Sequence, residues 1–127
     1  MVRNKTMAGF RYELNTPFDK RKEESKKLKE KYINRVPVII KKADNATNTP
    51  DIDKEKYLVP KDLDIAQFLY VIRKRIKLSP DQAVFLFCNN ETIPMASKFG
   101  TIYEEKSKDD GFLYLMYSLE STFGFSF

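Results

Sequence analysis

The chain has 127 residues, of which 42% are hydrophobic and 32% are charged. This balance is typical of one soluble folded domain and not of a disordered segment. There is no His and only one cysteine, Cys88, which excludes a Cys–His nucleophile pair and the usual zinc sites. The four glycines are scattered and form no phosphate-binding loop. We therefore expect no enzymatic activity and no bound metal or cofactor.

The net charge of +5 is unevenly distributed along the chain. Residues 1–60 contain fifteen Lys and Arg against nine Asp and Glu, whereas residues 61–127 contain eight against nine. The basic first half would attract an acidic peptide, an anionic lipid surface or a nucleic acid, and charge alone does not choose among them. No apolar run approaches the roughly 20 residues that cross a bilayer, and no signal-peptide pattern is present, so we expect a cytoplasmic protein.

The first 33 residues predict two helices. Phe10 and Leu14 are spaced i,i+4, as in a short helix. A second helix is expected to start with Thr16 as its N-cap and Pro17 at its first helical position, and to run to about Lys31. Its apolar stripe is thin, which is typical of a helix that lies on a surface with most of its charges in water.

The remaining chain alternates strand and helix patterns. Asp62 or Asp64 can cap the first helix of this region, residues 89–92 are expected to form a turn, and Cys88 falls in an apolar run and is expected in the core. Strands are predicted at residues 36–40, 56–60, 84–88 and 112–118, and helices at residues 65–78 and 97–106.

This β-β-α-β-α-β order is that of the ubiquitin-like β-grasp. We therefore predict an α+β fold in which a four-stranded mixed sheet grips one long helix, with two extra N-terminal helices. A single domain is expected over residues 1–127. It would comprise an N-terminal helical subdomain (1–33), a β-grasp core (34–118) and a flexible C-terminal tail (119–127).

Two segments carry more apolar residues than a core needs. On the predicted helix at 65–78, the main apolar stripe comprises Ile65, Phe68, Leu69, Ile72 and Ile76. Val71 lies well off its centre and shares one shoulder with Phe68 and Arg75, which suggests a partly exposed pocket with a basic rim. The strand at 56–60 is apolar on both faces, with Leu58 opposite Tyr57. It is either buried on both faces or an edge strand that can pair with an extended peptide beside a hollow.

The end of the chain contains a lone glycine, Gly124, in a short polar tail. Because glycine has no Cβ, the backbone there can enter a narrow enzyme channel. Cleavage of the Gly124–Phe125 bond would leave the terminal glycine carboxylate that ubiquitin-like modifiers use. The alternative is a chain end whose glycine is accidental.

Six segments together resemble the autophagy-related protein 8 family, the lipid-conjugated ubiquitin-like modifiers that include the GABA receptor-associated proteins. They extend, in the family's order, over nearly all of the chain from residue 17 to residue 124. The segments are Pro17-Phe-Asp-Lys-Arg, Asn34-Arg-Val-Pro-Val-Ile, Asp51-Ile-Asp-Lys-Glu-Lys-Tyr-Leu-Val-Pro60, Gln67-Phe-Leu-Tyr-Val-Ile-Arg-Lys-Arg75, Asp109-Asp-Gly-Phe-Leu-Tyr114 and Thr122-Phe-Gly124.

The resemblance implies a modifier of autophagy that is not itself an enzyme. A cysteine protease would remove residues 125–127. Activating and conjugating enzymes would then carry Gly124 as a thioester before its amide linkage to phosphatidylethanolamine. The protein would be cytoplasmic, then on the autophagosome membrane and in the vacuole or lysosome lumen. It would be a monomer in solution, with no nucleic acid partner, and would support membrane tethering and expansion.

The resemblance also implies docking of cargo receptors that carry aromatic-x-x-aliphatic motifs. Arg35 and Arg75 would meet acidic residues of the ligand, with Lys54 and Lys56 also on the basic flank. The aromatic hollow would comprise Glu24, Leu28, Pro37, Ile39, Lys56, Leu58 and Phe112. The aliphatic hollow would comprise Tyr57, Val59, Pro60, Leu63, Phe68 and Val71.

Some positions depart from the family pattern. Leu119 stands where many relatives have Gly, the turn at residues 43–49 is one residue longer, and about seven extra residues precede the usual start. The competing hypothesis is a basic β-grasp module that binds peptides, cytoskeleton or RNA through residues 1–60 and is never conjugated. It predicts that Gly124 is dispensable, whereas a lipid-conjugated modifier requires it.

Overall fold

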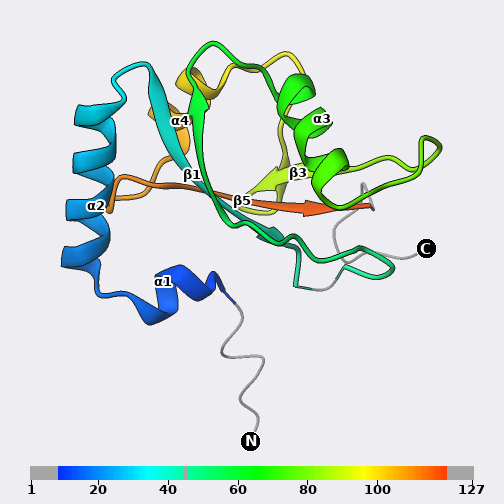
Figure 1. Ribbon diagram of the computed structural model, residues 1–127, viewed down its shortest axis with the longest axis horizontal. Helices are drawn as coiled ribbons and strands as arrows, with labels where there is room; N and C mark the ends of the chain where they lie inside the picture. Colours follow the sequence, from blue (N-terminus) through cyan, green and yellow to red (C-terminus); the bar gives the residue numbers. More distant parts are fainter. Residues whose placement is uncertain (1–8, 45, 120–127) are drawn as a thin grey trace, which may run out of the picture.

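A computed structural model of the chain describes residues 9–44 and 46–119. Two helices precede a mixed sheet, and two more helices are inserted between its strands (Figure 1). The elements are α1 (Arg11–Asn15), α2 (Phe18–Lys31), β1 (Arg35–Lys42), β2 (Lys56–Pro60), α3 (Ile65–Arg75), β3 (Phe85–Cys88), β4 (Glu91–Thr92), α4 (Phe99–Lys106) and β5 (Leu113–Ser118).

The described strands form one sheet in the order β2-β1-β5-β3-β4. β1 and β2 form an antiparallel hairpin, β1 and β5 are parallel, and β3 is antiparallel to both β5 and β4. Helices α1 and α2 lie beside one face, and α3 and α4 lie beside the other (Figure 1). Among the described strands, β2 is therefore one edge of the sheet.

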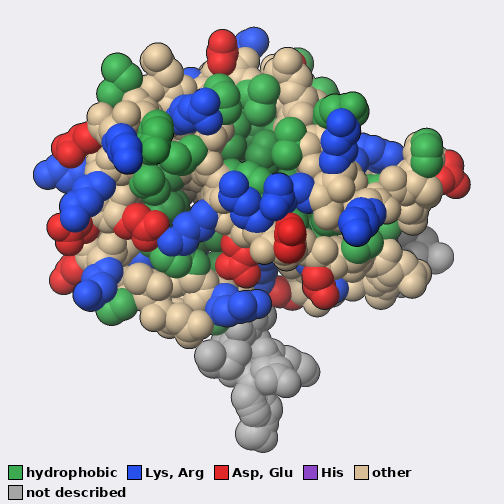
Figure 2. Space-filling view, viewed as in Figure 1, with side chains coloured by type: hydrophobic (Ala, Val, Ile, Leu, Met, Phe, Trp, Pro, Cys, Tyr) green, Lys and Arg blue, Asp and Glu red, His purple; other side chains and the backbone are tan. Residues whose placement is uncertain are grey.

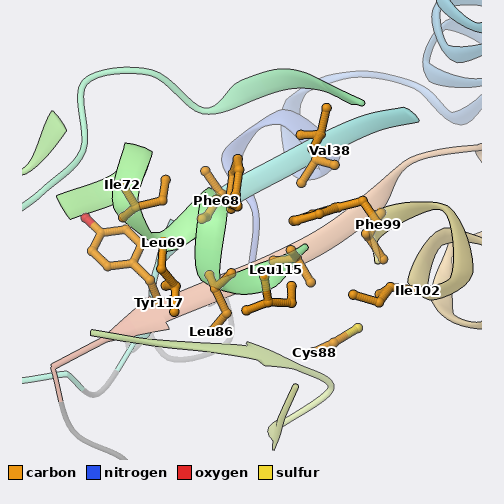
Figure 3. Close-up of a cluster of buried hydrophobic side chains, with 14 of the residues drawn as sticks. Val38, Phe68, Leu69, Ile72, Leu86, Cys88, Phe99, Ile102, Leu115 and Tyr117 are labelled. Atoms are coloured by element: carbon orange, nitrogen blue, oxygen red, sulfur yellow. The ribbon is translucent and has the colours of Figure 1, made fainter. Parts of the chain in front are cut away.

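The main core lies between the sheet and α3 and α4. Because side chains alternate along a strand, Val38 and Ile40 of β1 and Leu115 of β5 point to this side and are fully buried. Side chains of α3 and α4 pack onto them (Figure 3). Cys88 is a buried free thiol in this cluster, as predicted, and burial raises its pKa.

The opposite face of the sheet is covered by the N-terminal helices. Here Ile39, Phe112 and Tyr114 are buried. The ring of Phe10 lies edge-on to that of Tyr114, with 5.0 Å between centroids, and Tyr12 lies edge-on to Phe112 at 5.2 Å. Both faces of the sheet are thus packed, and α1 is attached to the sheet by its aromatic side chains.

A buried carboxylate joins α2 to the segment before β5. Nε of Arg21 and the hydroxyl of Tyr114 both donate to Oδ2 of Asp110, at 2.8 and 2.5 Å. The backbone N–H of Phe112 donates to Oδ1 at 3.0 Å, and the hydroxyl of Ser25 donates to the Asp110 backbone carbonyl at 2.5 Å. We call these residues the Asp110 cluster; they fix the position of α2 on the sheet.

The described residues form a sheet of five strands and not the predicted four, because Glu91 and Thr92 form β4 where a turn was expected. Asn89 and Asn90 both have positive φ angles, of 54° and 66°. Asparagine tolerates this conformation, which the tightest two-residue hairpin turn requires at both central positions. Glu91 therefore pairs directly with Cys88.

Three helix ends also differ from the predictions, one of them the start of α4, at Phe99 and not at residue 97. Pro17, and not Thr16, is the N-cap of α2, because Thr16 instead ends α1 by donating its N–H to the carbonyl of Tyr12. Helix α3 ends at Arg75, three residues early, where the chain turns through Lys77 with φ 57°. Its start is capped by Asp64, one of the two expected residues. No helix in residues 9–44 and 46–119 is long and apolar enough to cross a membrane.

Candidate functional site

A hollow of about 510 Å³ lies between α2 and the edge strand β2. We call it the α2–β2 hollow. In the space-filling view, apolar side chains gather here between Lys and Arg side chains (Figure 2). It is lined by Glu24, Leu28, Tyr32, Arg35, Pro37, Lys54, Lys56, Tyr57, Leu58 and Phe112.

Strand alternation produces this hollow. Pro37 and Leu58 lie opposite each other in the β1–β2 pair, and both line the hollow on the face that α2 covers. Leu28 lines it from α2. Phe112 also lines the hollow and is only 1% exposed, so it forms the base of the hollow. The hollow thus has apolar walls and a charged rim.

Six of the seven residues predicted for an aromatic hollow line the α2–β2 hollow. The exception is Ile39, which is buried beside Phe112 and does not line it. Tyr32 lines the hollow but was not among the predicted residues. Tyr32 is the C-cap of α2, and its spacing four residues after Leu28 was the available signal.

The hydrogen bonds at the two ends of the β1–β2 hairpin define which groups of β2 face outward. Ile40 donates its N–H to the carbonyl of Glu55, and Lys61 donates its N–H to the carbonyl of Asn34. In an antiparallel pair, bonded and non-bonded positions alternate, so the N–H and C=O of Leu58 point away from β1. These groups can pair with an extended peptide.

Arg35 and Lys56 place positive charge along this edge. Arg35 donates from Nη1 to the outward carbonyl of Leu58 at 3.3 Å. Nζ of Lys56 donates to Oε2 of Glu24 at 2.8 Å and lies 4.2 Å from the ring centroid of Tyr12. The Glu24–Lys56 ion pair therefore connects α2 to β2 at the rim of the hollow.

Glu24 also accepts a hydrogen bond from the hydroxyl of Tyr12. Partial burial opposes the charge of Glu24, but the hydrogen bonds from Lys56 and Tyr12 outweigh it, so the pKa of this carboxyl lies below its ordinary value. Burial and the same hydrogen bond raise the pKa of Tyr12. At neutral pH the rim therefore contains an ionised Glu24 beside Lys56.

The residues predicted for an aliphatic hollow lie around the other side of β2, near α3. Tyr57, Pro60 and Leu63 are partly buried and Val71 is 39% exposed; we call these four residues the β2–α3 patch. Apolar side chains are visible in this region between the two elements (Figure 2).

Phe68 and Val59 belong to the core and not to the surface, since each is only 2% exposed. Phe68 lies edge-on to Phe99 at 4.9 Å and to Tyr57 at 5.6 Å. Phe68 therefore lies in the core stripe of α3, as its helical spacing predicts, and does not form an open wall of the aliphatic hollow with Val71. Its ring supports Tyr57 from beneath, and only Val71 reaches the solvent.

Arg75 is paired within the chain. Its Nε lies 3.2 Å from Oδ1 of Asp53, in the loop before β2. Beside this pair, the hydroxyl of Tyr57 is buried and has no hydrogen-bond partner among the described residues, and burial raises the pKa of Tyr57 to about 12. Nζ of Lys54 lies 5.0 Å from the centroid of the same ring.

Gly124 and Phe125 lie outside the described residues. The last described residue, Leu119, packs against the main core, and its N–H donates to Oγ1 of Thr49 at 3.4 Å. The hydroxyl of Tyr117 donates to the carbonyl of Pro50 at 2.5 Å. The end of β5 is thus held by the loop between β1 and β2. The described residues contain no group of three or more acidic or Cys side chains that could hold a metal ion.

Comparison with known proteins agrees with this fold. The family model described as "Autophagy protein Atg8 ubiquitin like" matches residues 20–124. Autophagy-related protein 8A of Oryza sativa subsp. indica is 53% identical over 118 residues, covering 93% of this chain and 98% of that protein. Autophagy-related protein 8e of Arabidopsis thaliana is 49% identical, covering 93% and 96%.

A solved structure is also similar. The crystal structure of Trypanosoma brucei ATG8 superposes with a TM-score of 0.84 at 35% identity, covering 91% of this chain and 99% of that chain. The predicted ubiquitin-like α+β fold is therefore confirmed, with five strands in place of four. Taken together, a family match over most of the chain and relatives near 50% identity show that the chain belongs to the Atg8 family of ubiquitin-like autophagy proteins.

Proposed function

We propose that this protein is a ubiquitin-like modifier of autophagy that acts by docking peptide motifs on β2 while attached to a membrane lipid. A cysteine protease cuts after Gly124, and activating and conjugating enzymes transfer the new carboxyl end to the amine of phosphatidylethanolamine. The conjugated protein resides on the autophagosome membrane, where it supports tethering and expansion. Family membership over residues 20–124 supports this proposal.

The observation that carries the docking part is the open edge of β2 beside the α2–β2 hollow. The outward groups of Leu58 can bond to the backbone of an extended peptide. The hollow can then take an aromatic side chain, and the β2–α3 patch can take an aliphatic side chain further along the peptide. Cargo receptors with aromatic-x-x-aliphatic motifs present this pattern.

Intact-mass analysis of the protein recovered from its own cells tests the conjugation part. The wild-type protein should lack residues 125–127, and a membrane-bound fraction should carry the added mass of phosphatidylethanolamine. Gly124→Ala should keep all 127 residues and gain no lipid. Ser126→Ala lies beyond the cut and is the matched control, because it should be processed normally. A lipid-bound Gly124→Ala protein, or a wild-type protein never shortened, would refute the proposal.

A further inference from the structure

The ion pair between Arg75 and Asp53 lies at the edge of the proposed docking surface. Arg75 is the last residue of α3, and Asp53 lies three residues before β2 begins at Lys56. Both charges act on the phenol of Tyr57, a residue of β2 that borders the α2–β2 hollow and whose ring contacts Phe68 on the α3 side. The pair is therefore next to the point where a peptide on β2 would pass from the hollow to the β2–α3 patch.

This ion pair can exchange partners easily. The side chain of Arg75 is 37% exposed and that of Asp53 is 74% exposed. The pair has a single contact at 3.2 Å, and no other hydrogen bond of Asp53 is found among the described residues. Exposed ion pairs of this kind contribute little stability. The Arg21–Asp110 pair contrasts with it, because Asp110 is buried, the Arg21 side chain is only 12% exposed, and Asp110 accepts further hydrogen bonds.

We propose that Asp53 is an internal competitor for the acidic residues of the docked peptide. In the free protein its carboxylate occupies Arg75. A carboxylate of the peptide, beside its apolar anchors, replaces Asp53 on the guanidinium when the peptide pairs with β2. Binding of an acidic peptide then exchanges one ion pair for another and gains little from Arg75. This inference rests on the proposed docking function and deepens it, since Asp53 sets how strongly the surface selects acidic ligands.

Calorimetric titration of two synthetic peptides tests the exchange. Both peptides have the same aromatic-x-x-aliphatic core. One has Asp or Glu beside the anchors, and the other has Asn or Gln at the same positions. Asp53→Asn frees Arg75, so it should tighten the acidic peptide by about two- to fivefold, the range of one exposed ion pair, and leave the neutral peptide unchanged. The salt dependence of acidic-peptide binding should become steeper.

Asp51→Asn is the matched control. Asp51 lies in the same loop and the change in net charge is the same, but its carboxylate pairs with Lys42, 2.9 Å away. Equal tightening by Asp51→Asn would overturn the proposal, because the effect would then come from net charge. Unchanged affinity of Asp53→Asn for the acidic peptide would also overturn it.

A double-mutant cycle assigns the effect to the pair. In an Arg75→Gln background, Asp53→Asn should no longer change the affinity for the acidic peptide, since the contested guanidinium is absent. Persistent tightening in that background would contradict the exchange. Failure of the docking function gives a different result, since the wild-type protein would then bind neither peptide while remaining folded.

Discussion

Replacing Asp110 with Asn tests how firmly the N-terminal helices are attached to the sheet. The carboxylate of Asp110 accepts hydrogen bonds from Arg21, Tyr114 and the N–H of Phe112 at distances of 2.5–3.0 Å. An amide has only one acceptor oxygen, so it must turn its NH₂ group toward at least one of these donors. It also leaves the guanidinium of Arg21, whose side chain is 12% exposed, without a counter-charge.

Removing one partner from a buried ion pair costs about 3–5 kcal/mol. We expect the lower end, about 3 kcal/mol, because the amide oxygen still accepts one hydrogen bond and Nη1 of Arg21 keeps its bonds to the carbonyls of Glu13 and Thr16. For a domain of this size, that loss lowers Tm by roughly 10 °C. Urea unfolding followed by circular dichroism measures the loss of unfolding free energy.

Asp109→Asn is the control for this substitution. Asp109 is adjacent and exposed, so the same change of charge should alter the unfolding free energy by no more than about 0.5 kcal/mol. A loss below about 1 kcal/mol in Asp110→Asn, or an equal loss in the control, would refute the reasoning. Peptide affinity should fall together with stability, because α2 provides one wall of the α2–β2 hollow.

Three further predictions concern the docking surface. Replacing Tyr57 and Leu58 together with Ala should weaken aromatic-x-x-aliphatic peptides by about 2–4 kcal/mol in calorimetry while circular dichroism stays unchanged. Tyr57→Phe removes a buried hydroxyl without a described partner and should stabilise the protein by up to about 1 kcal/mol. It should also reduce the loss of stability as pH rises from 10 toward 12, because the raised pKa of the Tyr57 phenol no longer contributes while those of Tyr12, Tyr114 and Tyr117 remain. Glu24 has a lowered pKa when folded, so its contribution to stability is present above pH 4.5 and is lost as the pH falls below it; Glu24→Gln should flatten this part of a urea-unfolding series.

The helices and most strands could be predicted from the sequence because their signals are local. Apolar periodicity and the cap at Asp64 depend on residues within one or two turns. β4 was missed because two positive-φ asparagines convert an apparent turn into a two-residue hairpin. This conformation depends on pairing with β3 as much as on the asparagines themselves.

The contacts that organise the site are long-range, and this limits what the sequence can predict. The α2–β2 hollow could be placed by resemblance and by alternation along β2. The helical spacing places Phe68 in the core stripe of α3, but it contains no information about Phe99, which covers Phe68 from α4 and keeps it out of the aliphatic hollow that the resemblance implied. The pairing of Arg75 with Asp53 and of Arg21 with Asp110 joins residues 22 and 89 positions apart. No local pattern indicates either pair.

The two edge strands of the described sheet, β2 and β4, differ in their capacity to pair with another chain. Charge explains how β2 can stay open to a peptide without pairing with a second copy of the protein. β4 has only two residues, both exposed, so it offers almost no ladder to another chain. β2 has five residues, and Arg35, Lys54 and Lys56 line the hollow beside it, with Arg35 on the outward carbonyl of Leu58. Two copies that met along β2 would bring these cations together, and positively charged edges oppose such pairing. A peptide with carboxylates beside its anchors neutralises the same charges. The basic edge therefore opposes self-association and favours an acidic extended ligand. Because salt screens both interactions, added salt should weaken the binding of the acidic ligand and reduce the repulsion between two copies.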